Sequence, residues 1–385
     1  MSSKSLPVIG LVVAMLLTGI GTYTYLGAHQ SVVRRPAKAP SEVKLPAPTP
    51  ESLLSGTLYV AQGGALYSLA GGQFKELTAA AGWMQPQALP GGTTLVAVKR
   101  EGTYADIYQL AADGKVIARL TNNAAPSRYS DIGSNHWSFY PTPAPDGKTV
   151  FMSYDSDKAL DYQADLAIWQ MPLGGTRAQW RQWTVPNNYT GGDVQPLPLA
   201  SGGLLYVKYD QDSDGSKAAQ IWFKPQRTGR ATPLTKLEDD CSQPALSPDG
   251  KTLAMICSSK QQFSHLVLAD FDGSGIGPLR TIVTDHMVAQ PAWAPDGSGI
   301  AYLAPAQPDQ PFQLWWLPKA GYAVPSPAPT PSATTAASPS PGRKATPTPG
   351  RRPSPSPSPS PRPVTPIQIT TDLGFDASSP IAWKA

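Results

Sequence analysis

One short segment recurs along the chain and constrains its fold more than any other feature. In each copy, a proline leads a few mostly apolar residues into a tight turn, and a second apolar run follows. The clearest copies are PTPAPDGKTVFMSY from Pro141, PALSPDGKTLAMIC from Pro244 and PAWAPDGSGIAYLA from Pro291. Weaker copies begin at Pro86 and Pro196, and Pro380 opens another near the end of the chain. Repeats of roughly 50 residues indicate that one structural unit is used several times.

Each repeat has the pattern of four short strands. Pro-Asp-Gly favours a turn because proline presets φ and glycine tolerates a positive φ. Residues 252–257 illustrate the second strand, residues 312–316 the aromatic third strand, and Leu120-Thr121 the end of the fourth. Short strands bounded by glycine and proline turns, four to a unit, are typical of β-propeller blades. The sequence therefore predicts an all-β fold, a six-bladed β-propeller with four-stranded blades.

The two ends of the repeat region complement each other. Residues 56–60, 65–69 and 74–78 match strands two, three and four, with no first strand before them. Residues 379–385 supply a first strand with nothing after it. We expect the C-terminal strand to close the ring beside the N-terminal strands, since closure removes the open edges of a linear array. The predicted propeller comprises residues 55–322 and 367–385.

The P-x-[aromatic or apolar]-x-P-D-G-K units and the Leu-Thr strand ends resemble those of the TolB-like, WD-repeat-like six-bladed propellers of bacterial envelopes. The resemblance covers roughly residues 55–322 and 367–385, the whole predicted propeller. The shared motif is specific for the fold but indicates the function only in broad terms. Members of this family serve as binding scaffolds, as propellers attached to peptidases, and occasionally as lyases.

A long uncharged segment precedes the propeller. After a short tail of residues 1–5, residues 6–28 contain no charged side chain. At about 1.5 Å per residue they are long enough to cross a hydrocarbon core of roughly 30 Å. We expect a retained transmembrane signal-anchor; a cleaved signal peptide is the alternative, although Leu26 stands where cleavage after Ala28 favours a small residue. The Pro-rich residues 29–54 predict a tether.

The orientation of this anchor and the charge of the chain suggest where the protein resides. Arginines and lysines after the span, taken alone, would keep the propeller in the cytoplasm. The very short N-terminal tail favours the opposite orientation, with the propeller on the extracytoplasmic side of a bacterial cell membrane. Once the basic flanking segments are set aside, the propeller is mildly acidic, which argues against a nucleic-acid partner.

Residues 323–366 form a basic, low-complexity insertion between strands three and four of the last repeat. They alternate proline with serine, threonine and alanine, and contain arginines and one lysine but no acid. Such a composition predicts an extended, disordered segment. Two interpretations remain open: a neutral insertion, or a basic arm that contacts anionic wall polymers, lipid headgroups or an acidic partner.

The two cysteines flank one predicted hairpin. Cys241 and Cys257 are equidistant from Asp249 at the centre of its turn. Residues placed in this way face each other across an antiparallel pair, within the range that a disulfide needs. We predict a disulfide, which suits an oxidising compartment. Two buried thiols or a metal site are the alternatives.

Four long loops are predicted on one face of the ring: residues 122–137, 155–165, 187–193 and 210–220. Elaborate loops on a rigid scaffold commonly carry binding function. The candidate contacts in these loops are Arg128, Tyr129, His136, Trp137, Tyr162 and Tyr189. The alternative interpretation is that the loops are long without a binding role.

One of these loops resembles the start of a calcium-binding loop. Asp210, Asp212 and Asp214 precede Gly215 in a D-x-D-x-D-G pattern, in which alternate carboxylates converge on one cation. The bidentate glutamate of an EF-hand is replaced by Ile221. An acidic hairpin turn, which needs the same residue types, is the alternative to a calcium site. We predict no other cofactor.

No recognisable catalytic motif is present, because the chain lacks a G-x-S-x-G elbow and a full G-x-G-x-x-G loop. The sequence therefore favours a membrane-anchored, extracytoplasmic, non-catalytic scaffold that binds a protein or a cell-envelope polymer. The alternative is an extracytoplasmic hydrolase or lyase that acts on carbohydrate or peptide.

Overall fold

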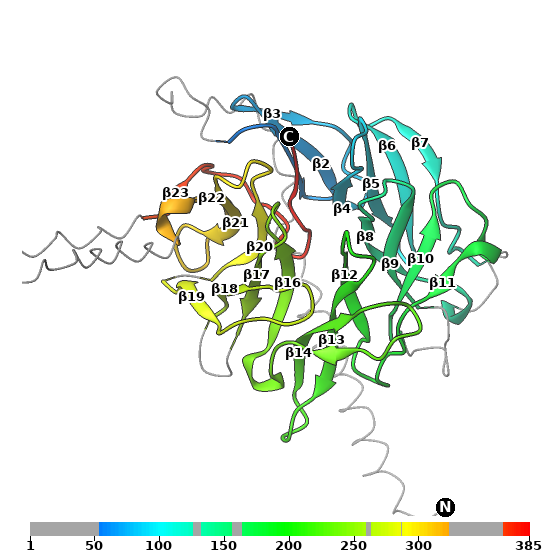
Figure 1. Ribbon diagram of the computed structural model, residues 1–385. Helices are drawn as coiled ribbons and strands as arrows, with labels where there is room; N and C mark the ends of the chain where they lie inside the picture. Colours follow the sequence, from blue (N-terminus) through cyan, green and yellow to red (C-terminus); the bar gives the residue numbers. More distant parts are fainter. Residues whose placement is uncertain (1–53, 126–131, 156–163, 259–262, 286, 323–364) are drawn as a thin grey trace, which may run out of the picture.

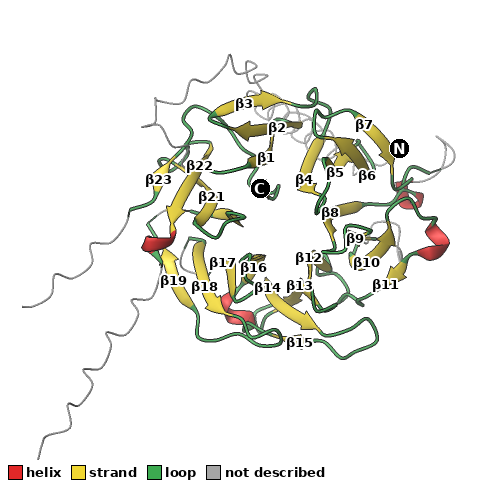
Figure 2. Ribbon diagram, turned by 45° about the horizontal axis from the view of Figure 1, so that its top comes forward, coloured by secondary structure: helices red, strands yellow, loops and turns green. Residues whose placement is uncertain are grey.

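Six antiparallel sheets of four strands each are arranged around a central axis (Figures 1 and 2). The computed structural model describes residues 54–125, 132–155, 164–258, 263–285, 287–322 and 365–385. The predicted all-β, six-bladed propeller with four-stranded blades is confirmed. We number the blades 1 to 6 in chain order, with blade 1 containing β1.

In each blade, the four strands lie side by side, with the first at the channel and the fourth at the rim. The innermost strands are β24 (Ala382–Lys384), β4 (Trp83–Ala88), β8 (Ser138–Pro143), β12 (Asp193–Pro198), β16 (Cys241–Leu246) and β20 (Ala289–Trp293). The second strands are β1 (Thr57–Gln62), β5 (Thr94–Arg100), β9 (Thr149–Tyr154), β13 (Leu204–Gln211), β17 (Thr252–Cys257) and β21 (Gly299–Pro305). The third strands are β2 (Ala65–Ala70), β6 (Ala105–Ala111), β10 (Ala167–Pro172), β14 (Lys217–Lys224), β18 (His265–Asp270) and β22 (Phe312–Pro318). The outermost strands are β3 (Gln73–Glu76), β7 (Val116–Arg119), β11 (Arg181–Gln182), β15 (Thr232–Pro233), β19 (Arg280–Val283) and β23 (Ile367–Gln368).

Short 3₁₀ helices interrupt four of the connections: η1 (Ile132–Ser134), η2 (Arg177–Gln179), η3 (Leu237–Asp239) and η4 (Lys319–Gly321). Among the described residues, no helix is both long and apolar enough to cross a membrane. The predicted anchor, residues 6–28, the tether up to residue 53 and the insertion from residue 323 to 364 lie outside the described residues.

Blade 1 is built from both ends of the chain. Strand β24 pairs antiparallel with β1, with Leu58 opposite Trp383 and Tyr59 opposite Ala382. Gly56 has a positive φ of 76° just before β1, and a Cβ there would collide with the carbonyl oxygen of Lys384. Both sheet edges that a linear array would leave open are therefore paired within the ring.

The core lies in wedges between neighbouring blades rather than at one centre. Strand β9 shows the reason: all but its first residue are buried, because both faces of the sheet pack against a neighbouring blade. Between blades 2 and 3, for example, Val98 and Ile107 pack with Met152 and Met171. Each buried aliphatic side chain of this size contributes about 1.5–3 kcal/mol.

The threonine at the end of strand four has the same role in five blades. Its Oγ1 accepts a hydrogen bond of 2.9–3.0 Å from a backbone N–H of the third strand. The threonines are Thr78, Thr121, Thr184, Thr235 and Thr370. This contact explains why Leu-Thr recurs, although the member in blade 3 follows Trp183 and was not found from the sequence.

In blade 5, a disulfide joins Cys241 in β16 to Cys257 in β17, where the two residues face each other in register. One predicted loop is different in the structure. Residues 210–220 are mostly strand, because β13 and β14 remain paired as far as Gln211 and Lys217. Only residues 212–216 turn, so Asp210 belongs to a strand end.

Candidate functional site

The propeller has two distinct faces, which follow from the antiparallel order of the strands. The long-loop face consists of the connections between second and third strands and between successive blades. Its described residues are 63–64, 77–82, 101–104, 120–125, 132–137, 155, 164–166, 183–192, 212–216, 234–240, 258, 263–264, 284–285, 287–288, 306–311 and 369–381. The PDG-turn face consists of the other connections, with described residues 71–72, 89–93, 112–115, 144–148, 173–180, 199–203, 225–231, 247–251, 271–279, 294–298, 319–322 and 365–366.

Both segments outside the propeller join it at the PDG-turn face. Ser55, at the end of the N-terminal segment, donates its hydroxyl to Asp296 Oδ2 at 3.1 Å. Lys319, near the start of the insertion, donates its backbone N–H to Ser298 O at 2.8 Å. Asp296 and Ser298 belong to one Pro-Asp-Gly turn in blade 6, so the two segments begin beside each other and the long-loop face is on the opposite side.

Two of the predicted contacts, His136 and Trp137, lie together where blade 2 connects to blade 3. His136 Nδ1 is 3.3 Å from Asp155 Oδ1 and 3.1 Å from the Asp155 carbonyl oxygen. The Trp137 backbone N–H donates to the same carboxylate oxygen at 2.6 Å. Asp155 is only 1% exposed, whereas the His136 side chain is 26% exposed. A buried carboxylate thus orients an imidazole that still reaches solvent.

The Trp137 ring extends this group across the blade boundary. It stacks on Phe139 with ring centroids 5.8 Å apart, and the Arg100 guanidinium lies 5.7 Å from its centre. Arg100 ends β5 in blade 2, whereas Phe139 is in β8 of blade 3. A cation beside an aromatic ring is modestly attracted to it, which restrains both side chains.

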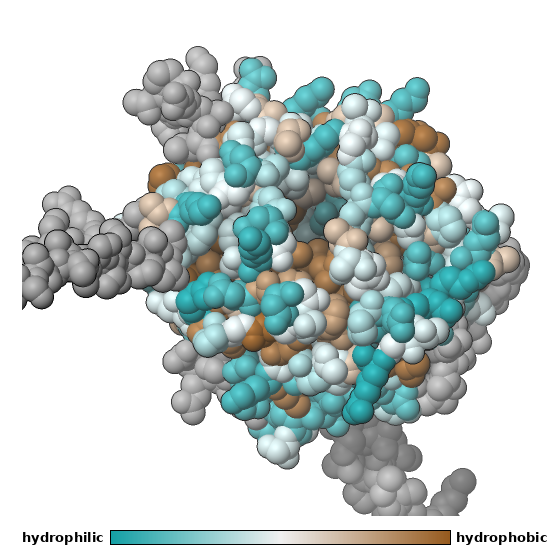
Figure 3. Space-filling model, viewed as in Figure 1, coloured by the Kyte–Doolittle hydropathy of each residue, from teal (hydrophilic) through white to brown (hydrophobic). Residues whose placement is uncertain are grey.

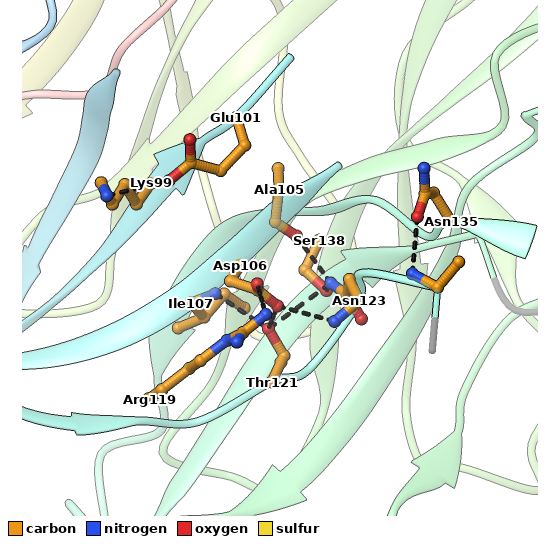
Figure 4. Close-up of polar contacts among 11 residues, drawn as sticks. Lys99, Glu101, Ala105, Asp106, Ile107, Arg119, Thr121, Asn123, Asn135 and Ser138 are labelled. Carbon is orange, nitrogen blue, oxygen red and sulfur yellow. Dashed lines mark hydrogen bonds and ion pairs between the residues drawn. The ribbon is translucent and has the colours of Figure 1, made fainter. Parts of the chain in front are cut away.

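A buried polar network joins the same two blades (Figure 4). Asp106 Oδ1 accepts hydrogen bonds from Thr121 Oγ1 at 2.7 Å and from the Asn123 backbone N–H at 3.0 Å. Its other oxygen pairs with Arg119. Asn123 Nδ2 donates across the blade boundary to Ser138 Oγ at 2.7 Å. Buried hydrogen-bond networks of this kind rigidify the elements that they join.

Tyr189 lies in the next blade-to-blade connection, which is held by a second buried carboxylate. Asp165 accepts backbone hydrogen bonds from Tyr189, Thr190 and Gly191 at 2.7–3.0 Å. Tyr189 adopts a positive φ of 61° and its side chain is 57% exposed. The backbone of this connection is therefore firmly positioned while the ring points away from the core.

The same connection is tied to blade 4 by a lysine that is also ion-paired within that blade. Lys208 Nζ in β13 is 3.1 Å from Asp193 Oδ1 and 3.0 Å from the carbonyl oxygen of Val185. Asp193 is fully buried, and this burial raises its pKa to about 6, although Lys208 opposes the shift. Val185 itself is 79% exposed.

Three of the predicted binding residues cannot be placed. Arg128, Tyr129 and Tyr162 lie outside the described residues.

Two residues that position this site were not predicted. Neither Asp155 nor Asp165 was chosen from the sequence, yet these two carboxylates position His136, Trp137 and Tyr189. The sequence did contain a signal for them, since Asp155 and Asp165 are the first and last residues of the long loop predicted at 155–165.

The predicted calcium ligands form a tight turn. Asp212 Oδ1 accepts the backbone N–H groups of Asp214 and Ser216 at 3.0 and 3.1 Å. Asp214 Oδ1 accepts the Ser216 N–H at 2.9 Å, and Asp210 Oδ1 accepts that of Gln211 at 2.8 Å. In the described part of the chain, no three acidic, histidine or cysteine side chains are grouped as metal ligands. Calcium binding remains a prediction. The carboxylates of Asp212 and Asp214 already accept backbone hydrogen bonds that stabilise the turn.

The central channel is a separate, neutral site. A cavity of about 320 Å³ is lined by the innermost strands, and the space-filling view is hollowed near its centre (Figure 3). Its lining consists of prolines, amides, small aliphatic side chains, Thr142, Tyr140 and two tryptophans, Trp293 and Trp383. Proline is tolerated there because the innermost strand is an edge strand, whose free side faces the channel.

A ring of hydrogen bonds, the channel belt, joins the blades at this channel. The belt residues precede the leading prolines: Gln85, Tyr140, Gln195, Gln243, Gln290 and Ser379. Four links run from a backbone N–H to the side chain of the preceding blade at 2.6–2.7 Å. A Tyr140–Gln195 side-chain contact and a bond from Gln290 Nε2 to Ala377 O complete it. All but Ser379 have a positive φ near 50° at a β-bulge.

Comparison with known proteins supports the fold. No family model matches the chain. The Bacillus subtilis (strain 168) protein named uncharacterized peptidase YuxL is 34% identical over 97 residues, 25% of this chain and 14% of that protein. The crystal structure of TolB from Acinetobacter baumannii matches 68% of this chain and 61% of its own, with 17% identity and a TM-score of 0.51. A putative TolB from Agrobacterium tumefaciens matches 69% of this chain and 86% of its own, with 16% identity and a TM-score of 0.48.

These likenesses extend to part of each protein only. The chain spans 14% of the length of YuxL and less than two thirds of Acinetobacter TolB. At 17% identity the solved structure establishes a shared fold and no shared activity. The chain is a TolB-like six-bladed propeller in its architecture.

Proposed function

We propose that this protein is a membrane-anchored, extracytoplasmic scaffold that binds another protein through its long-loop face without catalysis. Residues 6–28 are the anchor and residues 29–54 the tether. The tether joins the propeller at Ser55 on the PDG-turn face, so the long-loop face is directed away from the anchored end. This geometry leaves the long-loop face accessible to a partner.

The observation that carries this proposal is the distribution of exposed apolar side chains. Of the exposed large hydrophobic residues, Val185, Tyr189, Phe263 and Met287 are on the long-loop face. Val116, Ile117 and Ile367 are in outermost strands, and among the described residues Leu279 alone is in a connection of the PDG-turn face. Exposed apolar and aromatic side chains gathered on one face are typical of protein-binding surfaces.

Charge favours a protein over an anionic envelope polymer as the partner. The exposed or half-buried acids of the long-loop face are Glu101, Asp212, Asp214, Glu238, Asp239, Asp240, Asp285, Asp309, Asp372 and Asp376. Lys236 is the one lysine or arginine in the described parts of those connections. An anionic polymer approaching this face would meet like charge, which costs binding energy.

The PDG-turn face differs in charge. Its described connections contain the acids Asp113, Asp146, Asp249, Asp272 and Asp296 and the bases Lys115, Lys148, Arg177, Arg227, Arg230, Lys251 and Lys319. Because the bases outnumber the acids, the described connections of the two faces have opposite net charge. Charge is therefore distributed asymmetrically along the propeller axis, and the acidic long-loop face is the one opposite the tether.

The proposal is tested by co-purification after crosslinking in the native membrane. The full chain is compared with a Val185→Ser/Tyr189→Asn variant and with a variant lacking residues 323–366. We expect one partner that the full chain and the deletion variant capture and the Val185/Tyr189 variant loses. Asparagine is chosen because it tolerates the positive φ at position 189. Capture of the same partner by all three forms would contradict binding through this face.

A hydrolase is the second candidate, and the His136–Asp155 pair supports it. A buried carboxylate that orients a solvent-reaching imidazole is an arrangement used for proton transfer. The similarity to a protein named as a peptidase, which covers 14% of that protein, also favours a hydrolase. Turnover of peptide or glycan substrates by the full chain, lost in His136→Gln, would favour this function over the scaffold.

A further inference from the structure

Blades 3 and 4 present a rigid surface on the long-loop face whose composition identifies the kind of partner. The surface consists of the exposed side chains of Val185 and Tyr189 and the acidic hairpin at Asp210, Asp212 and Asp214. We propose that this blade 3–4 surface binds a cationic protein segment that also carries apolar side chains. The inference rests on the proposed scaffold function and specifies its partner.

The apolar part of this surface is rigidly positioned. Asp165 accepts three backbone N–H groups from residues 189–191, and Lys208 donates to the carbonyl oxygen of Val185. A backbone that is already held in place loses little conformational freedom when a partner binds, which keeps the cost of ordering low. Val185 is 79% exposed and Tyr189 57% exposed, so both remain accessible to a partner.

The acidic part is adjacent through strand β13. Lys208, which holds the Val185 carbonyl, is two residues before Asp210, where the hairpin begins to leave the sheet. The hairpin continues through Asp212 and Asp214 without a base before Lys217. On its other side it approaches Asp240 of the next connection, whose pKa is raised by burial and also by the charge of Asp212.

Together these features select one class of occupant. Apolar anchors fit an apolar or aromatic side chain, and the surrounding carboxylates attract lysine and arginine. A neutral peptide would lack the electrostatic attraction, and an anionic one would be repelled. The two parts also have separable effects: charges set the salt dependence of binding, whereas buried apolar contacts persist at high salt.

The test measures binding of three labelled peptides to the purified full chain in a nonionic detergent by fluorescence anisotropy. The probes are (Lys-Leu-Lys-Lys), (Lys-Ser-Lys-Lys) and (Glu-Leu-Glu-Glu), each repeated three times. We expect the lysine–leucine peptide to bind most tightly and the glutamate peptide to show no binding. Equal affinity for the lysine–leucine and lysine–serine peptides would overturn the role of the apolar anchors.

Two matched variants separate the two parts of the surface. Asp210→Asn/Asp214→Asn keeps the side-chain acceptors of the turn and removes two charges. It should weaken binding by at least about fivefold at low salt and flatten the dependence between about 0.1 and 0.5 M salt. Val185→Ser/Tyr189→Asn should weaken binding with the salt dependence unchanged.

The control, Asp146→Asn/Asp249→Asn, removes two exposed turn carboxylates from the PDG-turn face. It should bind as the unaltered chain does, and equal loss in this control would overturn the assignment to blades 3 and 4. If crosslinking in membranes captures a partner that depends on Val185 and Tyr189 while the cationic peptides do not bind, only this inference fails and the scaffold function stands.

Discussion

Gln243 Oε1 accepts a hydrogen bond of 2.6 Å from the backbone N–H of Gln290, although the two residues lie in neighbouring blades. Comparable bonds join Gln195 to Gln243 and Gln85 to Tyr140. Each donor residue is at a β-bulge with a positive φ, a conformation that costs about 1–3 kcal/mol for a residue other than glycine. The channel belt therefore stabilises a strained backbone and links the blades at the axis.

A substitution within the belt tests this role. Gln243→Met keeps the length of the side chain and removes the acceptor, so the Gln290 N–H loses its partner. The free energy of unfolding should fall by about 1–3 kcal/mol, measured by urea denaturation. Gln211→Met, in the exposed end of β13, is the control and should change the stability little. Equal stability of the two variants would show that the belt does not stabilise the ring.

The strand-four threonines are expected to differ in importance. Thr78→Val leaves the backbone N–H of Leu66 without its acceptor. Thr121→Val does the same to Ile107 and also removes a donor to buried Asp106. We predict a loss of about 1–3 kcal/mol for Thr78→Val and about 1 kcal/mol more for Thr121→Val, since bonds to charged groups are stronger. A smaller loss for Thr121→Val in thermal unfolding would contradict the network in Figure 4.

The disulfide of blade 5 should contribute measurably to stability. Cys241 and Cys257 are separated by 16 positions, a loop whose closure contributes about 3 kcal/mol in the chain-entropy account. The Cys241→Ala/Cys257→Ala variant should unfold at lower urea concentration than the oxidised chain. Reductant should lower the stability of the unaltered chain and leave that of the variant unchanged. A reductant effect of equal size on both would place its target elsewhere.

Asp193 should give the chain a specific dependence on pH. Its pKa is raised to about 6 in the folded state by burial, from about 3.9 when unfolded. A carboxyl group with a raised folded pKa favours folding when protonated, so its contribution is complete below about pH 4 and is lost as pH rises through 6.

The measurement is the difference in unfolding free energy between the unaltered chain and Asp193→Asn across this range. The difference should shift in favour of the unaltered chain by about 2 kcal/mol as pH falls from 7 to 4. Asp146→Asn, at an exposed turn, serves as the reference for general acid effects. A difference that stays constant with pH would show that Asp193 titrates alike in both states.

The architecture was predictable because its determinants are local and repeated. Pro-Asp-Gly turns and alternating strands identify a blade within about 50 residues, and the complementary ends predicted the β24–β1 pairing that the structure contains. The bulge in each innermost strand was not predicted, because a positive φ at Gln243 has no sequence marker such as glycine. The turn of this hairpin is centred between residues 249 and 250, not at Asp249 as predicted. The extra residue of the bulge in β16 compensates for this shift, so Cys241 still lies opposite Cys257.

The candidate site was less predictable because it depends on contacts between blades. The predicted long loops place His136, Trp137 and Tyr189 on one face, as the structure does. Asp155 faces Trp137 just beyond the last β8–β9 pair of blade 3, whereas Asp165 reaches the connection between blades 3 and 4, and no sequence motif marks either contact. Charge segregation between the faces also required the strand order, since the net charge of the whole chain conceals it.

The most direct test of the central claim is site-specific photocrosslinking of the full chain in its native membrane. A photoreactive residue replaces Tyr189 on the long-loop face in one variant and Lys148 on the PDG-turn face in another. Both positions are exposed. The account predicts a discrete crosslinked protein from position 189 that is absent from position 148. A discrete product from position 148 alone would contradict it and place the binding surface on the tethered face.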